Sequence, residues 1–289
     1  MKNLEQNLNT FTAETVETSY IEADGIRFAY RTFGKPSDVP LVFCQRFRGT
    51  IDDWDPALIN ELARERTIIL FDNAGIGLSS GETPESFFGT AKYAYAFIRA
   101  LGLKQVDLLG FSMGGYIAQI VALEHPDLVR RLILAGTGGG TGEGTEAGKP
   151  EVFQVAFKPV NVAEDFLYLF FEQTETSRAA GLAYLERLAR RKESRAPLVK
   201  PESVQAQIKG AGAWRTISTF DRLGEIKQPV LVANGNHDIM IPTVNSYIIS
   251  QRIPNAQLII YPDSGHGFLF QYPEMFAEHV NIFLNKNLK

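Results

Sequence analysis

Residues 110–115, with the sequence Gly-Phe-Ser-Met-Gly-Gly, have the types and spacing that turn a serine into a nucleophile. The run matches G-x-S-x-G, in which a strand turns sharply into a helix and leaves the serine exposed at the turn. Gly110 and Gly114 suit this turn because side chains there would collide with neighbouring backbone. The N–H groups that begin the helix would face the negative charge that develops when Ser112 attacks a carbonyl carbon. We therefore predict Ser112 as a catalytic nucleophile.

A serine hydroxyl is a weak nucleophile, so it needs a general base and an acid that orients the base. His266 is the best candidate for the base, because it lies between two glycines in a loop after the last predicted strand. His125 is interpreted as the end of a helix and His279 as a residue within one. His237 is expected near the site without taking part in the chemistry.

The orienting acid should follow another strand at the same edge of the sheet. Asp238 meets this condition, because it comes shortly after the predicted strand 230–233. The resulting chain order of serine, aspartate and histidine is the one found in α/β-type serine hydrolases. Asp263 is too close to His266 in sequence to turn back on it, and Asp72 is expected to hold the loop that follows it. Asp238 is therefore the predicted acid.

Strand and helix patterns alternate along most of the chain, which predicts a parallel sheet with helices on both faces. Asp24-Gly25 between the first two strands is a strong hairpin signal. The predicted strands span residues 18–23, 26–33, 41–44, 67–71, 105–111, 131–135, 230–233 and 257–261. The predicted helices span residues 54–64, 86–101, 113–123, 243–252 and 274–285.

The alternation is interrupted once, by a segment that has helical periodicity and no strand pattern. We place this helical insertion at residues 138–214, between two parts of one α/β core at 18–137 and 215–289. Residues 1–17 are polar and without a pattern, and they are expected to form a flexible tail.

Composition excludes several classes of protein. The chain has 289 residues, 45% of them apolar, and a formal charge of −4, so it can bury a large core and is not disordered as a whole. The pI of about 5.7 argues against a nucleic-acid partner. No segment has the pattern of a secretory signal or a membrane span, and the single cysteine, Cys44, cannot form an internal disulfide. We expect a cytoplasmic protein without a membrane partner, and its oligomeric state stays open.

These motifs together resemble the α/β-hydrolase superfamily, over about residues 18–288. The landmarks are residues 110–115, Asp238, the Gly-His-Gly run at 265–267, and residues 71–80, which match the D-x-x-G-x-G-x-S loop of the family. The resemblance implies the α/β-hydrolase fold: a mostly parallel sheet of about eight strands, flanked by helices, with the insertion forming a cap over the pocket.

The chain departs from the family after its third strand, where most members have His-Gly and this chain has Gln45-Arg46. The resemblance implies that the backbone N–H groups of Phe47 and Met113 form the oxyanion hole, which binds the developing negative charge. Loss of the glycine leaves the geometry of this turn open. Five side chains are predicted to contact the substrate: Gln45, Arg46, Phe166, Phe170 and Trp214.

Residues 45–49, 53–56 and 71–75 resemble a bacterial subgroup of serine esterases that includes serine-dependent macrolide esterases. We expect hydrolysis of a small-molecule ester or lactone through an acyl-enzyme, and a macrolide lactone is the most specific expectation. This chemistry requires no cofactor and no metal. A carbon–carbon hydrolase, an amidase and a cofactor-free haloperoxidase stay open, because they also use the serine. A non-catalytic small-molecule receptor is a further alternative.

Overall fold

The structure is a computed structural model that describes residues 12–285. Within these residues, eight strands form one sheet in the order β1-β2-β4-β3-β5-β6-β7-β8. Strand β2 is antiparallel to both of its neighbours, β1 and β4, and the other pairs are parallel, so the predicted fold class is confirmed. The strands are β1 (Ser19–Ala23), β2 (Ile26–Gly34), β3 (Leu41–Cys44), β4 (Thr67–Phe71), β5 (Val106–Phe111), β6 (Val129–Ala135), β7 (Val230–Gly235) and β8 (Ala256–Tyr261).

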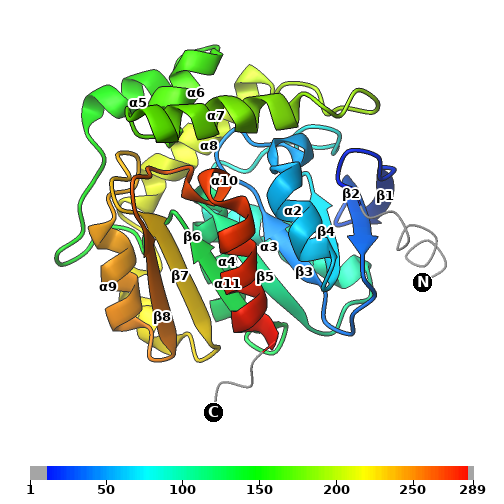
Figure 1. Cartoon of the computed structure of the whole chain (residues 1–289). Coiled ribbons are helices and arrows are strands. Elements are labelled where there is room, and N and C mark those ends of the chain that lie inside the picture. The colour runs from blue at the N-terminus through cyan, green and yellow to red at the C-terminus, as the bar shows by residue number, and fades with distance from the viewer. Residues whose placement is uncertain (1–11, 286–289) are drawn as a thin grey trace.

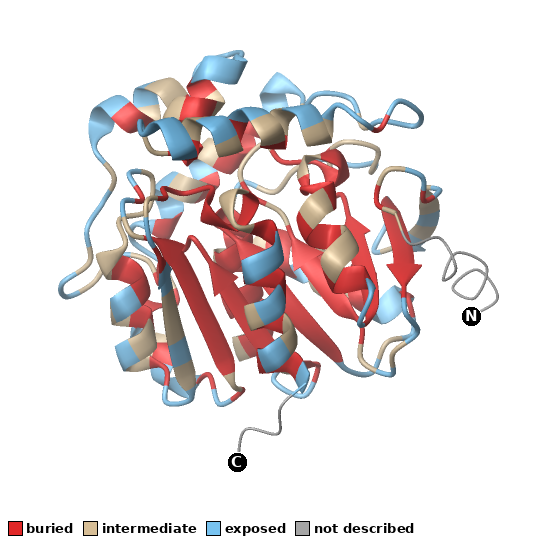
Figure 2. Ribbon diagram, viewed as in Figure 1, coloured by how far each residue is buried: buried red, intermediate tan, exposed pale blue. Residues whose placement is uncertain are grey.

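Helices cover both faces of the sheet (Figure 1). One face packs against α2 (Pro56–Ala63) and α11 (Pro273–Asn285), and the other against α3 (Phe87–Ala100), α4 (Met113–Glu124) and α9 (Val244–Arg252). Strands β3, β4 and β5 are buried along their whole length, as Figure 2 shows for the centre of the molecule. Their continuous apolar runs therefore follow from burial on both faces.

Helix α2 begins later than the sequence pattern predicts. A short 3-10 helix, η1 (Ile51–Asp53), comes first. Asp55 then caps α2, because its carboxylate accepts a hydrogen bond from the N–H of Ala57, and Pro56 occupies the first helical position. Cap residues and a proline at this position are a common way to start a helix.

The cap consists of α5 (Pro150–Ala156), α6 (Ala163–Phe170), α7 (Glu175–Leu188) and α8 (Pro201–Trp214), which follow β6 in the chain. These helices lie across the top of the molecule in Figure 1, over the ends of the strands. A second 3-10 helix, η2 (Phe220–Glu225), leads from the cap into β7, and the short α10 (Phe268–Gln271) precedes α11. Within residues 12–285, no helix has both the length and the apolar composition that a bilayer crossing requires.

The segment expected as a flexible tail is packed where the structure describes it, from residue 12 onward. Ala13 and Val16 are buried in the core. The guanidinium of Arg191, just after α7, donates hydrogen bonds to the backbone oxygens of both residues and of Glu14. Residues 1–11 lie outside the described residues.

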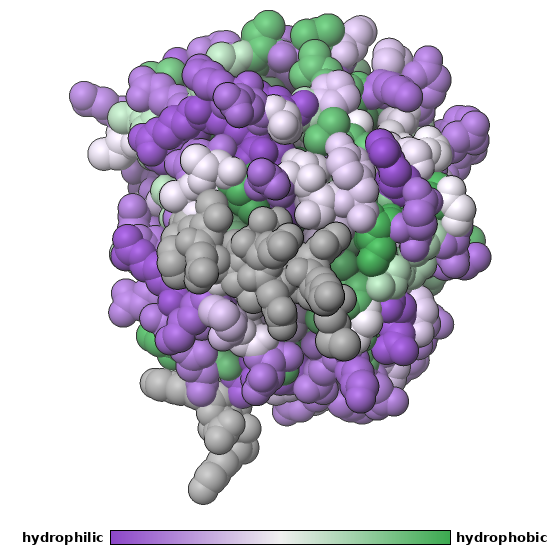
Figure 3. Space-filling model, turned by 90° about the vertical axis from the view of Figure 1, so that its right-hand side faces the viewer, coloured by the Kyte–Doolittle hydropathy of each residue, from purple (hydrophilic) through white to green (hydrophobic). Residues whose placement is uncertain are grey.

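Figure 3 shows one face of the molecule in a space-filling view. On the face shown in Figure 3, hydrophilic residues predominate and apolar side chains occur in separate groups, some of them on the cap. Scattered exposed apolar side chains are normal for a globular protein.

Asp72, directly after β4, is buried and holds the loop that follows it. Its carboxylate accepts the N–H of Ile51 at 2.6 Å and the N–H of Leu78 at 2.8 Å. A Cβ atom on Gly77 would lie 2.3 Å from Asp72 Oδ2, so only glycine fits at this position of the loop. Burial raises the pKa of the Asp72 carboxyl to about 7, although the two N–H groups oppose this change.

This raised pKa predicts that stability depends on pH. The folded state binds the Asp72 proton more tightly than the unfolded chain, so the associated stability is lost as pH rises from about 4 to about 7. The Asp72→Asn variant lacks this titration. The free energy of unfolding, measured with urea, should decrease for the wild type relative to Asp72→Asn as the pH rises through this range. A difference that does not change with pH would contradict the prediction.

Candidate active site

Ser112 lies at a sharp turn between β5 and α4, in a backbone conformation that is rare outside glycine. Its φ is 57° and its ψ is −122°. The turn is possible because its neighbours are glycines: a Cβ on Gly110 would lie 2.3 Å from the oxygen of Gly114, and a Cβ on Gly114 would lie 2.0 Å from that of Cys44. The Ser112 N–H donates to the oxygen of Ala135 at 2.9 Å. The serine is thus fixed at the carboxyl end of the central strand.

His266 and Asp238 are in direct contact. His266 Nδ1 lies 2.7 Å from Asp238 Oδ2, and both side chains are almost fully buried. The other oxygen of Asp238 accepts the N–H groups of Met240 and Ile241 at 2.8 and 2.9 Å, which fixes the carboxylate. His266 Nε2 is buried and has no hydrogen-bond partner among the described residues. The outer nitrogen of the imidazole is therefore free to take a proton.

The imidazole of His266 is held between two aromatic rings next to the serine turn. The ring of Phe111, the residue before Ser112, lies 4.9 Å away, and the ring of Phe170 from the cap lies 5.3 Å away. Within residues 12–285, no hydrogen bond joins Ser112 Oγ to His266 Nε2. Such bonds are often loose in a free enzyme and tighten when substrate binds.

Two backbone N–H groups lie where an oxyanion hole is expected. Met113 is the first residue of α4, so its N–H has no partner within the helix. The N–H of Phe47, in the turn after β3, likewise has no acceptor in the described part of the chain. The preceding N–H, that of Arg46, is occupied by Gln45 Oε1 at 2.8 Å. Phe47 and Met113 are therefore available as donors.

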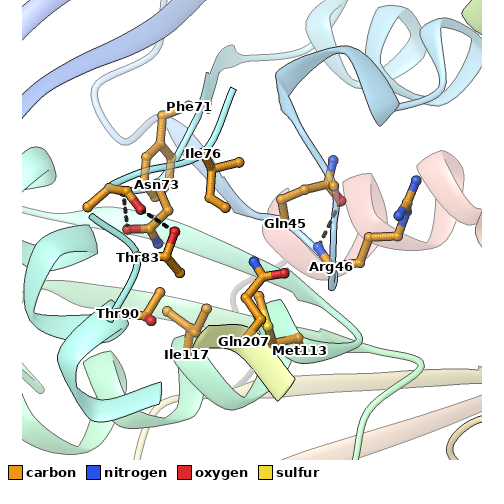
Figure 4. A pocket seen from close by; sticks show the side chains of 12 residues that line it. Gln45, Arg46, Phe71, Asn73, Ile76, Thr83, Thr90, Met113, Ile117 and Gln207 are labelled. Atoms are coloured by element: carbon orange, nitrogen blue, oxygen red, sulfur yellow. Dashed lines mark hydrogen bonds between the residues drawn. The ribbon is translucent and has the colours of Figure 1, made fainter. Parts of the chain in front are cut away.

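A cavity of about 20 Å³ lies beside Met113, between the turn after β3, the loop after β4 and the cap (Figure 4). It has room for about one water molecule. Gln45 and Arg46 line it, and Gln207 reaches into it from α8. Figure 4 shows the Arg46 side chain turned away from the part of the wall that Asn73 and Thr83 form.

The three cap residues predicted to contact the substrate pack against other side chains. Phe166 and Phe170 each face the guanidinium of Arg46 at 5.3 Å. Trp214 packs against the rings of Tyr116 and Phe87, at 4.9 and 5.6 Å. None of the three lines the cavity beside Met113.

Sequence reasoning missed the residues that hold the turn after β3. Thr50 and Asp53 cap η1: the Thr50 hydroxyl accepts the N–H of Asp52, and the Asp53 carboxylate accepts the N–H of Thr50. The T-x-x-D spacing was a usable signal for this cap. Within residues 12–285, no cluster of three or more histidine, cysteine, aspartate or glutamate side chains could hold a metal ion.

The geometry predicts that Ser112 reacts with a fluorophosphonate, a probe that labels serines activated by a neighbouring base. We expect one adduct per chain, located at Ser112 by peptide mass spectrometry. Ser112→Ala should abolish the adduct, and His266→Ala should slow its formation strongly. Labelling of Ser112 at the same rate without His266 would show that this imidazole is not the base.

Comparisons with known proteins identify the family of the chain. The family described as the α/β hydrolase fold matches residues 39–273. A poly(3-hydroxyalkanoate) depolymerase from Ectopseudomonas oleovorans is 30% identical over 270 residues, which are 93% of this chain and 92% of the relative. A 2-hydroxymuconate semialdehyde hydrolase from Pseudomonas sp. (strain CF600) is 28% identical over 228 residues, which are 78% of each chain.

A solved structure of an α/β hydrolase fold protein from Chitinophaga pinensis superimposes with a TM-score of 0.88 and 39% identity. The match covers 95% of this chain and 99% of that one. The family match spans well over half of the chain and includes the serine turn, the Asp238 loop and the His266 loop. The chain therefore belongs to the α/β-hydrolase family.

Proposed function

We propose that the protein is a serine hydrolase of carboxylic esters or lactones, and that Ser112, His266 and Asp238 form its catalytic triad. One observation carries the proposal: the buried imidazole of His266 is paired with Asp238 on one nitrogen and is free on the other. A base oriented in this way can take the proton from a serine that attacks a carbonyl carbon. The depolymerase relative supports ester chemistry by its name.

The reaction proceeds in two halves. His266 Nε2 takes the hydroxyl proton as Ser112 Oγ attacks the carbonyl carbon, and Asp238 stabilises the imidazolium that forms. The N–H groups of Phe47 and Met113 bind the oxyanion, and each such donor is worth about 3–4 kcal/mol of barrier. The imidazolium then protonates the leaving alcohol. Water, activated by the same imidazole, hydrolyses the acyl-enzyme and releases the acid.

Within this class we propose a macrolide lactone as the substrate, on the resemblance of residues 45–49, 53–56 and 71–75 to macrolide esterases. A macrolide ring is far larger than the cavity of about 20 Å³ beside Met113. The proposal therefore requires the cap to move away from the core when such a substrate enters.

Carbon–carbon bond hydrolysis is the second candidate, because the 2-hydroxymuconate semialdehyde hydrolase is also a relative. The same serine and oxyanion hole serve both reactions. Product analysis separates them: a lactone opens to a single product heavier by one water, whereas a carbon–carbon hydrolase splits its substrate in two.

Turnover should depend on Ser112. We expect the Ser112→Ala variant to lose at least about 10³-fold in kcat with its unfolding transition unchanged. Mass spectrometry should be run with 16-membered macrolides, short-chain p-nitrophenyl esters and 2-hydroxymuconate semialdehyde. Opening of the macrolide supports the specific proposal, and cleavage of simple esters alone supports the broader one. Equal rates for wild type and variant on every ester and lactone would overturn both.

A further inference from the structure

The turn after β3, residues 45–50, has Gln45-Arg46 where the resemblance to the family implies His-Gly. The structure shows how this turn is held. A circuit of hydrogen bonds between side chains and backbone runs around the turn and closes on itself. Its members are Gln45, Arg46, Thr50 and Asp53.

Gln45 spans the inside of the turn. Its Oε1 accepts the N–H of Arg46 at 2.8 Å, and its Nε2 donates to the oxygen of Thr50 at 2.9 Å. The turn leaves room for this side chain because residue 49 is glycine: a Cβ there would lie 2.4 Å from Gln45 Cγ. The side-chain amide of Gln45 thus fixes the peptide between residues 45 and 46. The N–H of Arg46 is occupied, so it is not available to bind the substrate.

Arg46 holds the other side of the turn. Its Nη1 donates to the oxygen of Phe47 at 2.9 Å, and its Nη2 pairs with Asp53 Oδ1 at 3.0 Å. The other oxygen of Asp53 accepts both the N–H and the hydroxyl of Thr50, at 2.7 and 2.9 Å, which completes the circuit. The Arg46 side chain is 4% exposed and lies against the rings of Phe166 and Phe170.

The N–H of Phe47 belongs to the peptide between these two fixed points. The peptide before it is held by Gln45, and the peptide after it is held by Arg46. An oxyanion hole works only if its donors are already oriented when the charge develops. The Arg46 oxygen of the same peptide accepts the N–H of Gly49 at 3.1 Å, and the two side chains hold the peptides on either side of it.

We propose that Gln45 and Arg46 are positioning residues, which orient the Phe47 N–H toward the oxyanion and do not themselves bind the substrate. This inference rests on the proposed serine hydrolase function. It replaces the expectation that the two side chains contact the substrate. It also links the oxyanion hole to the cap, because the guanidinium that holds the Phe47 carbonyl packs on two rings of α6.

The test is the Gln45→Met variant, which keeps the length of the side chain and removes both of its hydrogen bonds. An oxyanion hole stabilises the transition state more than the bound substrate. We therefore expect kcat for a p-nitrophenyl ester to fall by about 10–100-fold, with KM changed by less than about threefold. Binding of a trifluoromethyl ketone, which forms an oxyanion with the serine, should weaken by the same factor as kcat/KM.

Gln228→Met is the matched control. Gln228 is buried and, like Gln45, donates from its side-chain amide to backbone oxygen, here to the oxygens of Ala122 and Pro126 at 3.2 Å each, at the far end of α4. Its replacement should lower the thermal unfolding temperature without changing kcat. Unchanged kcat in Gln45→Met, or an equal loss in Gln228→Met, would overturn the proposal. A rise in KM without loss of kcat would overturn it too, because it would show that Gln45 binds the substrate.

Arg46→Met is a second variant in case Gln45→Met does not fold, since a methionine can still pack on the two cap rings. It should show the same selective loss of kcat, and wild-type kcat would overturn the role of Arg46. If wild type hydrolyses no ester faster than Ser112→Ala, the proposed function fails by itself. The rate of fluorophosphonate labelling at Ser112 then tests the positioning role, because the phosphoryl oxygen needs the same two donors. An unchanged labelling rate in both variants would overturn it.

Discussion

The site depends on one constraint, a serine held at positive φ where the central strand turns into a helix. A non-glycine residue in such a conformation costs on the order of 1–3 kcal/mol and persists only when its surroundings enforce it. Here the Ser112 N–H is bound to the oxygen of Ala135, and the Ser112 oxygen accepts the hydroxyl of Thr137 and the N–H of Gly115. The same turn starts α4 at Met113, so one local conformation sets the position of both Ser112 and the first N–H of the helix.

The cap contacts both the loop that carries His266 and the turn after β3, so its position and the geometry of the proposed site are coupled. On the His266 side, the oxygen of Phe170 accepts the N–H of Gly267 at 2.6 Å, and Asp263 accepts the hydroxyls of Thr174 and Thr176. These contacts hold the loop that carries the imidazole. If α6 and α7 move, these hydrogen bonds must either break or move with the helices. Entry of a large substrate therefore changes the position of the loop that carries His266 or the bonds that hold it.

On the oxyanion side, Arg48 has a positive φ of 56° and extends from the turn into the cap. Its guanidinium donates to the oxygens of Lys158 and Pro159 at 2.6 and 2.8 Å, and its N–H donates to Gln207 Oε1 at 3.0 Å. Together with the contact of Arg46 to two cap rings, these bonds join the turn to α6, α8 and the loop before α6. The cap thus supplies hydrogen bonds and ring contacts that hold the turn after β3 in place.

The local sequence determined the sheet, the order of its strands along the chain and the three residues proposed for the triad. Short apolar runs have few alternatives to buried strands. The serine turn and the loop around His266 need glycines at neighbouring positions, and those glycines are visible in the local sequence. Only the tertiary structure decided how Gln45 and Arg46 are used and that Ala13 and Val16 pack in the core. The partners in these cases are Asp53, the rings of α6 and Arg191, and the last two lie more than a hundred residues away. No local pattern indicates which distant group a flexible polar side chain will contact, because that contact depends on how the whole chain folds.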